Sequence, residues 1–248
     1  LDVSGSIDAT ELAQMKTAFI AFVEALSGTP TQFSVTQFST QATVLQGFTS
    51  DYEAVKAAIN SAGGGGWTNW EDGLNKAWST YDPRTDKPNL IIFSSDGNPN
   101  RRGTGGTSAT ETQAVAAAVS VADSIKNAGT RILALGIGSD LNTTNMIAIS
   151  GANVNTGILT SDVISTDFSE LAKDLGELAS KTCGGTITIK KYIDDISTPG
   201  GAGWQFNVLG TTNQTLITGT DGTTNTGKIP AGTYSVEEIN MLLGYSYG

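Results

Sequence analysis

The first residues of the chain, Leu-Asp-Val-Ser-Gly-Ser-Ile, place a carboxylate and two hydroxyl groups on alternate positions, at Asp2, Ser4 and Ser6. Alternate side chains of an extended segment point to the same side, and a bend at Gly5 lets all three oxygens face one point. Hard divalent cations bind oxygen ligands of these kinds. This stretch alone leaves two interpretations open: a strand end followed by a polar turn, or three ligands of a metal site.

Two other stretches carry oxygen ligands in similar positions. Asp96 follows an apolar segment in Phe-Ser-Ser-Asp-Gly, and Thr68 follows a glycine run in Gly-Gly-Trp-Thr-Asn. Each has a simpler interpretation, because Asp96-Gly97 fits an ordinary turn and Thr68-x-x-Glu71 fits a helix capping box. Taken together and in this order, they predict a metal site formed by Asp2, Ser4, Ser6, Thr68 and Asp96.

The elements that must position these residues alternate between helix and strand. The expected elements, in chain order, are a helix from Asp8 to about 26, strands at 32–39 and 42–48, a helix from Ser50 to Ile59, a helix within 67–81, a strand at 89–97, a helix at 110–128, a strand at 131–139, and helices at 142–150 and 167–181. This order, with continuous apolar strands, predicts an α/β fold with an open, mostly parallel, doubly wound sheet. Ligands of such sheets bind at the carboxyl ends of the strands, where both Asp2 and Asp96 are expected.

The pattern changes after residue 182. Short strands are expected at 186–193, 204–210, 214–219 and 232–239, separated by turn residues and without a helical period. We therefore expect two domains, 1–182 and a small all-β sandwich at 183–248. Only Leu1 precedes the polar end of the first strand, and no strand follows to close the last sheet, so we expect a chain truncated at both ends.

Composition narrows the function classes. The 248 residues include no histidine and one cysteine, Cys183, so catalysis by imidazole and a disulfide within the chain are excluded. The net charge of −10 argues against nucleic acid as a partner, and no apolar run is long enough to enter a membrane. The abundance of Thr, Ser, Asn and Gly favours an extracellular, cell-surface location. We expect a binding protein and not an enzyme.

The three motifs Asp-Val-Ser-Gly-Ser, Gly-Gly-Trp-Thr-Asn and Ser-Asp-Gly resemble those of the von Willebrand factor A domain, over about residues 1–182. The resemblance implies a metal-ion-dependent adhesion site with Asp2 and Asp96 as acidic ligands, direct or through water, and Ser4, Ser6 and Thr68 as hydroxyl ligands. It implies Mg²⁺, with Ca²⁺ or Mn²⁺ as substitutes, and an open coordination position for a partner's carboxylate. The family's loop usually reads Gly-Gly-Thr, and here Trp67 intervenes.

Residues 184–248 resemble the prealbumin-like or collagen-adhesin B-type domains of bacterial surface proteins, on segments such as Thr-Ile-Thr-Ile-Lys-Lys-Tyr-Ile-Asp. Some relatives form an internal Lys–Asn isopeptide bond beside a buried acid, and this likeness makes Lys190, Lys191 and Glu237 candidates. We expect no such bond here and regard these residues as ordinary charged strand residues.

Four residues flanking the predicted metal site are candidates for ligand contact: Trp67, Trp70, Arg101 and Arg102. The alternatives are core packing for at least one tryptophan and a solvated loop for the arginines. The leading hypothesis is an adhesion module, of a pilus or other adhesin, that binds a protein or glycan with an exposed carboxylate. The alternative is a structural subunit of a surface filament or sheath, in which neighbouring subunits are the partners and the metal adds stability.

Overall fold

The computed structural model describes residues 1–27, 29–81, 88–139, 141–182, 185–193, 197–210, 212–227, 229 and 233–240. The chain divides into two compact units, Leu1–Leu178 and Ala179–Gly248. The sequence-based boundary after residue 182 lies slightly later, at the end of the helix that crosses this division. Cys183 lies outside the described residues.

The first unit alternates helices and strands as the sequence predicts. Its helices are α1 (Ala9–Ala25), α2 (Tyr52–Ser61), α3 (Trp70–Ser79), α4 (Glu111–Asn127), α5 (Thr143–Ser150) and α6 (Leu171–Thr182). Its strands are β1 (Phe33–Phe38), β2 (Ala42–Thr49), β3 (Asn89–Ser95), β4 (Arg101–Arg102), β5 (Thr107–Ser108), β6 (Thr130–Ile137) and β7 (Val163–Thr166). Side-chain caps fix several helix starts: Asp8 and Thr110 form capping boxes that begin α1 and α4.

The first residues of the chain lie between two groups of strands. β3, β6 and β7 are parallel neighbours, and β1 pairs antiparallel with β2. The N–H of Val3 donates to Phe38 O (2.9 Å) and that of Phe38 to Leu1 O (2.9 Å), while the N–H of Asp2 donates to Ser94 O (3.2 Å). Segment 1–3 therefore joins the groups into the order β2, β1, segment 1–3, β3, β6, β7. The prediction of a mostly parallel α/β sheet is confirmed.

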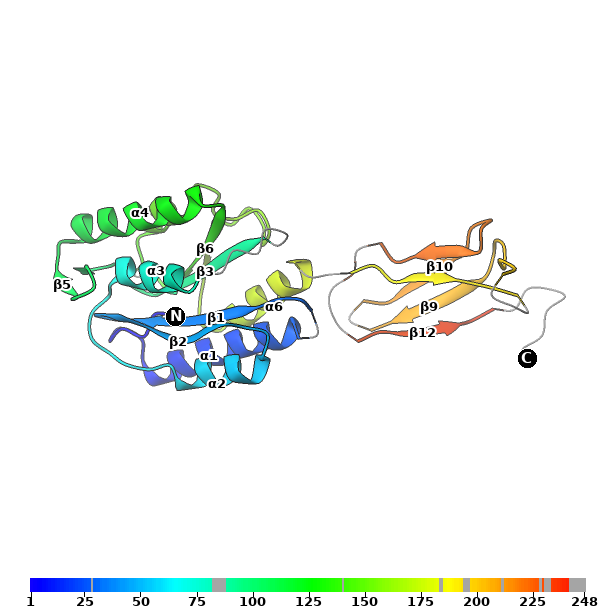
Figure 1. Ribbon diagram of the computed structural model, residues 1–248, viewed down its shortest axis with the longest axis horizontal. Coiled ribbons are helices and arrows are strands. Elements are labelled where there is room, and N and C mark those ends of the chain that lie inside the picture. The colour runs from blue at the N-terminus through cyan, green and yellow to red at the C-terminus, as the bar shows by residue number, and fades with distance from the viewer. Residues whose placement is uncertain are drawn as a thin grey trace. The chain divides into compact units, whose positions relative to one another are not determined.

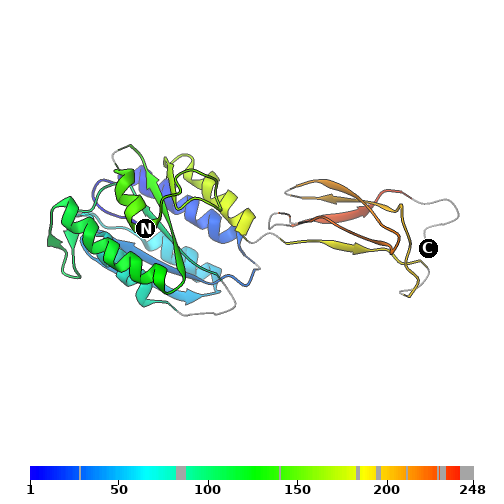
Figure 2. The ribbon, with the colours of Figure 1, turned by 90° about the horizontal axis from the view of Figure 1, so that it is seen from above.

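Helices cover both faces of this sheet. In Figures 1 and 2, α1, α2 and α6 lie on one face and α3 and α4 on the other. Beneath α3 and α4, the rings of Phe38 and Phe93 stack with centroids 5.1 Å apart, and Trp70 meets Phe93 edge-on at 5.4 Å. Within the described ranges, no helix combines the length and hydrophobicity needed to cross a membrane.

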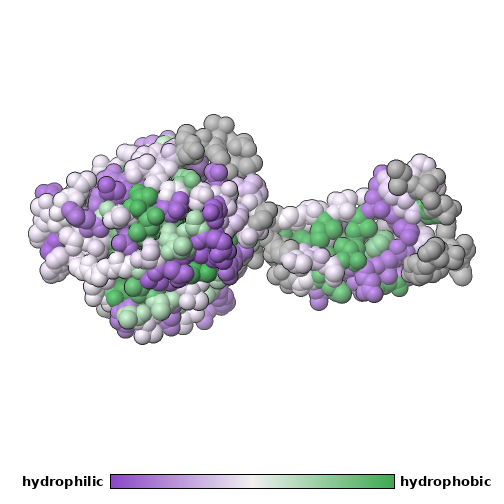
Figure 3. Space-filling model, turned by 60° about the horizontal axis from the view of Figure 1, so that its bottom comes forward, coloured by the Kyte–Doolittle hydropathy of each residue, from purple (hydrophilic) through white to green (hydrophobic). Residues whose placement is uncertain are grey.

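The described part of the second unit, after α6, contains strands and no helix. The strands are β8 (Thr188–Lys190), β9 (Gln205–Leu209), β10 (Gln214–Ile217), β11 (Thr223–Asn225) and β12 (Ser235–Glu238). They form two antiparallel sheets, β10-β9-β12 and β11-β8. Figure 3 shows hydrophobic surface on this unit, and its exposed large hydrophobic side chains are Leu209, Ile217, Val236 and Ile239. The sandwich architecture and the likeness to prealbumin-like domains stay predictions.

The charged residues singled out in this unit are arranged differently from expectation. Lys191 Nζ lies 2.8 Å from a carboxylate oxygen of Glu238 and 4.3 Å from the centre of the Trp204 ring. Lys190 instead lies over Tyr192, 5.2 Å from its ring centre. Glu237 is exposed. The exposed Glu237 is consistent with an ordinary charged strand residue, and in β12 it is Glu238 that pairs with Lys191.

Candidate metal centre

Asp2 is the innermost carboxylate of the site. Its side chain is fully buried, and its two oxygens accept hydrogen bonds from the Ser4 N–H (2.9 Å) and from the Ser95 hydroxyl. Burial, with a smaller contribution from the nearby charge of Asp96, raises the pKa of Asp2 to about 6, against the lowering effect of these hydrogen bonds. Because the Asp2 carboxylate is buried, a cation placed beside it would stabilise its charged form.

A chain of hydroxyls leads outward from Asp2 to the second carboxylate. Ser4 is almost completely buried, and its Oγ lies 3.2 Å from Ser6 Oγ. Ser6 Oγ in turn donates to Asp96 Oδ1 at 2.9 Å. The end of segment 1–3 and the end of β3 therefore meet at one rim, and ninety residues of sequence separate side chains in direct contact.

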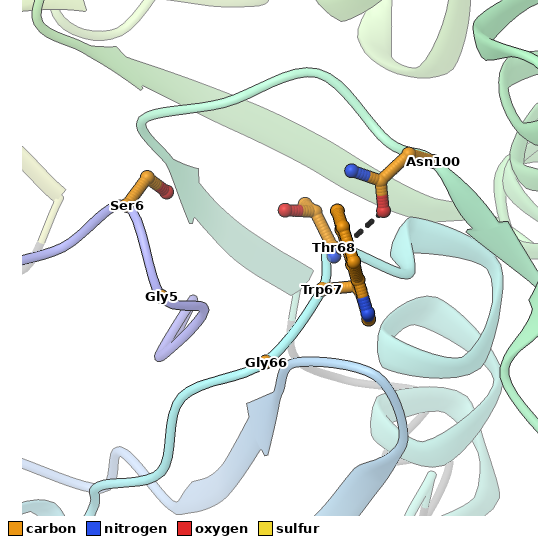
Figure 4. A pocket seen from close by; sticks show the side chains of 6 residues that line it. All are labelled: Gly5, Ser6, Gly66, Trp67, Thr68 and Asn100. Carbon is orange, nitrogen blue, oxygen red and sulfur yellow. Dashed lines mark hydrogen bonds between the residues drawn. The ribbon is translucent and has the colours of Figure 1, made fainter.

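Thr68 reaches the same rim from the loop between α2 and α3. In Figure 4 the hydroxyls of Ser6 and Thr68 point toward one another across the pocket. A Cβ on Gly97 would lie 3.6 Å from Ser6 Oγ and 4.0 Å from Thr68 Oγ1, so both hydroxyls face the space beside that glycine. The cap of α3 is Asn69, whose side chain accepts from the Asp72 N–H, and not Thr68. The Thr68 hydroxyl does not cap the helix and can therefore act as a ligand at the rim.

The glycine run before Thr68 lets this loop approach segment 1–6. The N–H of Gly65 donates to Val3 O (2.8 Å), and the N–H of Gly5 donates to Gly66 O (2.9 Å). Gly66 has φ +99°, and a Cβ there would lie 2.6 Å from Thr40 Oγ1. Only glycine adopts this backbone without strain and leaves room for the threonine. The run thus positions the threonine loop of the site.

The donor set of the site suits a hard cation. It contains two carboxylates and three hydroxyls, all oxygen, from three separate loops. Nowhere in the described part of the chain do three His, Cys, Asp or Glu side chains cluster as metal ligands. Zinc and copper prefer nitrogen and sulfur, whereas Mg²⁺, Ca²⁺ and Mn²⁺ accept hydroxyl, carboxylate and water oxygens. The residues present fit the latter group.

The rim opens into a pocket of about 530 Å³ lined by Gly5, Ser6, Gly66, Trp67, Thr68 and Asn100. Trp67 is 54% exposed there, and the Arg101 guanidinium lies 4.2 Å from the centre of its ring. Trp70 is completely buried and donates from its indole N–H to Ser95 Oγ at 3.2 Å, so its choice as a ligand contact was wrong. Arg102 is exposed at the hairpin β4–β5 and does not line the pocket.

Two supporting residues escaped the sequence analysis. Ser95 bonds to the Asp2 carboxylate, and its place inside Phe-Ser-Ser-Asp-Gly was the available signal. Asn100 accepts from the Thr68 N–H at 3.2 Å through its side chain, and its own N–H donates to Thr68 O at 2.9 Å. These two hydrogen bonds connect the loop that carries Thr68 to the loop after β3. No local sequence pattern around Asn100 predicts them.

Comparison with known proteins identifies the family of the first unit. Residues 1–174 match the family model of the von Willebrand factor type A domain. The comparison with curated proteins finds no match.

Three solved structures illustrate the likeness. Proximal thread matrix protein 1 from the mussel byssus, with a zinc-occupied MIDAS motif, is 21% identical with a TM-score of 0.56, and the match covers 76% of this chain and 47% of that one. The von Willebrand factor domain of the type V pili tip protein Mfa5 from Porphyromonas gingivalis is 14% identical (TM-score 0.58; 70% and 90% covered). Manganese-loaded Plasmodium vivax TRAP protein is 16% identical (TM-score 0.54; 96% and 91% covered). The present chain spans about half the length of the mussel protein, and at these identities the likeness establishes the fold alone.

Proposed function

The chain belongs to the von Willebrand factor type A domain family, and from that premise we propose that its first unit is a metal-dependent binding module of an extracellular surface protein. The module captures an acidic group of a ligand through a divalent cation. The observation that carries the proposal is the meeting of Ser4, Ser6 and Asp96 in one hydrogen-bonded chain, with the Thr68 hydroxyl turned toward the same space.

The cation would be held by Asp2, Ser4, Ser6, Thr68 and Asp96. Mg²⁺ is the first choice and Ca²⁺ or Mn²⁺ are substitutes, because the donor set is all oxygen. A protein of similar fold has been solved with manganese and another with zinc, so a divalent ion of either kind is a useful probe of the site. The bound cation would supply an electrophilic position for a ligand oxygen. Three of the five side chains are neutral hydroxyls, which are weaker ligands than carboxylates, so a ligand carboxylate would be a strong donor for the open position.

The supporting residues of this chain hold the ligand set in place. Ser95 orients the Asp2 carboxylate, and Asn100 anchors the loop that carries Thr68. Binding is the proposed activity and not catalysis, since the chain has no histidine to serve as general acid or base.

The test is a calorimetric titration of the metal-free protein with MgCl₂, followed by titration with a short peptide bearing one aspartate. Ser6→Ala should weaken Mg²⁺ binding at least about tenfold, because a ligand is lost. Ser124→Ala, on the exposed surface of α4, is the matched control and should bind as the wild type does. The peptide should bind only with Mg²⁺ present, and an affinity unchanged by chelator contradicts the proposal.

A second candidate function is a structural role in a surface assembly. It is favoured by the fold shared with a byssus thread matrix protein and a pilus tip protein. In that case a neighbouring subunit would fill the pocket and the metal would add stability. Sedimentation in Mg²⁺ separates the two, because a structural role requires metal-dependent self-association and ligand capture does not.

A further inference from the structure

A tryptophan and an arginine form one wall of the pocket beside the predicted metal site. Trp67 lines the pocket with Ser6 and Thr68, and just over half of its surface is exposed. The Arg101 guanidinium covers its ring at 4.2 Å, although Arg101 does not itself line the pocket. Tryptophan and arginine are both enriched where proteins bind partners. The wall therefore offers an apolar surface and a charged edge within reach of the rim.

Arg101 is fixed in position relative to the metal ligands. Its backbone N–H donates to Thr68 O at 3.1 Å, and its Nη1 donates to Asn100 O at 2.8 Å and, more weakly, to Ser108 Oγ at 3.4 Å. A guanidinium carries five N–H groups, and within the described part of the chain only those on Nη1 donate hydrogen bonds, so Nε and Nη2 are available to a ligand. The anchoring lowers the entropy that Arg101 loses when it binds one.

Arg101 also lacks an internal carboxylate partner among the residues that the structure describes. Lys56, Lys126, Lys173 and Lys191 all pair with Asp or Glu side chains. In a chain of net charge −10, an arginine without such a partner beside the pocket is a local positive centre on an acidic protein.

We propose that the ligand of this site is a protein segment with two acidic side chains a few residues apart. One carboxylate meets the cation, and the second pairs with the guanidinium of Arg101 while the segment packs on Trp67. This inference rests on the proposed metal-dependent binding. A polyanionic glycan fits less well, because its charge runs along its whole length and the chain itself carries a net charge of −10.

The neighbouring arginine supplies a matched control. Arg101 and Arg102 are consecutive residues of β4, and consecutive side chains of a strand point to opposite faces. Arg101 faces Trp67, so Arg102 faces away from that ring. Arg101→Gln and Arg102→Gln change the net charge by the same amount, and only the first removes the proposed contact.

The experiment selects phage-displayed random peptides on the full chain in MgCl₂ and elutes them with EDTA. Peptides selected on the wild type should share one acidic residue and a second at a constant spacing. Arg101→Gln should weaken the affinity of the selected peptides about fivefold and remove the preference for the second acidic residue. Arg102→Gln should change their affinity less than about twofold. Arg101→Glu should shift that second position to Lys or Arg.

Other outcomes separate this inference from the proposed function. Peptides that elute with EDTA but carry a single acid, or that respond equally to both arginine variants, overturn the inference and leave metal-dependent capture standing. Selection of no peptide that elutes with EDTA, while uronate-bearing oligosaccharides bind in Mg²⁺, overturns the protein ligand. The absence of Mg²⁺-dependent binding to either probe contradicts both proposals.

Discussion

Replacing Asp2 by asparagine should stabilise the metal-free protein and remove its response to Mg²⁺. The carboxylate is fully buried, and burial raises its pKa from 3.8 to about 6. An asparagine keeps the hydrogen bonds: its carbonyl accepts from the Ser4 N–H and its amide donates to Ser95 Oγ. The Ser95 hydroxyl can then donate to Gly97 O, which lies 3.0 Å away. The substitution thus removes the charge, and Ser95 Oγ, which also accepts from the Trp70 indole N–H at 3.2 Å, gains a further donor.

The size of the effect follows from the pKa shift. A carboxylate whose pKa is raised on folding binds its proton more tightly in the folded state. The stability that this proton contributes is fully present below the pKa of the unfolded state and is lost as the pH rises through the pKa of the folded state. For Asp2 the loss begins near pH 3.8 and is complete above about pH 6. A shift of about two units corresponds to ~3 kcal/mol as an upper figure. The amide of the Asp2→Asn variant does not titrate, so the difference between the two proteins reports the charge at Asp2, including its effect on the buried amine of Leu1, whose pKa burial lowers to about 6.

The assay is urea unfolding followed by tryptophan fluorescence, in EDTA and in MgCl₂, from about pH 4 to about pH 8. In EDTA the variant should be no more stable than wild type at the acidic end and more stable by up to about 3 kcal/mol at the alkaline end. In MgCl₂ the wild type should regain stability, because cation binding to the folded state adds RT ln(1 + [Mg²⁺]/Kd), and the variant should not. Parallel stability curves in EDTA, or equal stabilisation of both proteins by Mg²⁺, would refute the reasoning.

Three further predictions compare neighbouring residues by thermal or urea unfolding and metal titration. Trp70→Ala should lower the free energy of unfolding by about 3–5 kcal/mol, because the ring is completely buried. Trp67→Ala, at a half-exposed position, should lower it by less than about 1 kcal/mol. Equal losses would contradict the assignment of Trp70 to the core and Trp67 to the pocket. Glu238→Gln should destabilise the second unit by roughly 1–3 kcal/mol, because it breaks the partly buried ion pair with Lys191. Glu237→Gln, at an exposed position, should have little effect on stability. An intact mass lower by one ammonia would show an isopeptide bond, which we do not expect. Gly97→Val should weaken Mg²⁺ binding measured by calorimetry, because its methyl groups would occupy the space faced by two hydroxyls of the site, and unchanged binding would place the cation elsewhere.

The α/β fold and the rim residues were predictable because both depend on local pattern and sheet topology. Apolar strands that alternate with capped helices define a parallel sheet, and polar residues at strand carboxyl ends meet at one edge. Ser4, Ser6 and Asp96 follow this rule and form one hydrogen-bonded chain, and Asp2 accepts from the Ser4 N–H beside them. The metal itself and the ligand remain proposals.

The sequence left alternatives open for Trp70 and Glu237, because the outcome depends on partners distant in sequence. Trp70 begins α3, and only the packing of that helix on Phe93 decides that its ring is buried. In β12, Glu238 and not Glu237 is directly opposite Phe206, whose side chain is buried, so Glu238 shares the inner face. A shift of one residue exchanges the two faces of a strand, and the sequence of β12 alone does not fix its register.

The glycine run shows a different limit. The sequence predicts a loop there, but the need for glycine at Gly66 comes from a close approach to Thr40 and from a positive φ. Both features are set by the way segment 1–6 and the loop pack together. Trp67 therefore stands at the rim without displacing Thr68 from the site.

The most direct test of the central claim is the anomalous diffraction of crystals soaked in MnCl₂. We expect one strong manganese peak within about 2.0–2.3 Å of the hydroxyl oxygens of Ser4 and Ser6, the range expected for hard divalent cations with oxygen ligands. The Thr68 hydroxyl should coordinate the same ion directly or through one water. A manganese peak elsewhere, or no peak at this rim under saturating metal, would contradict the account.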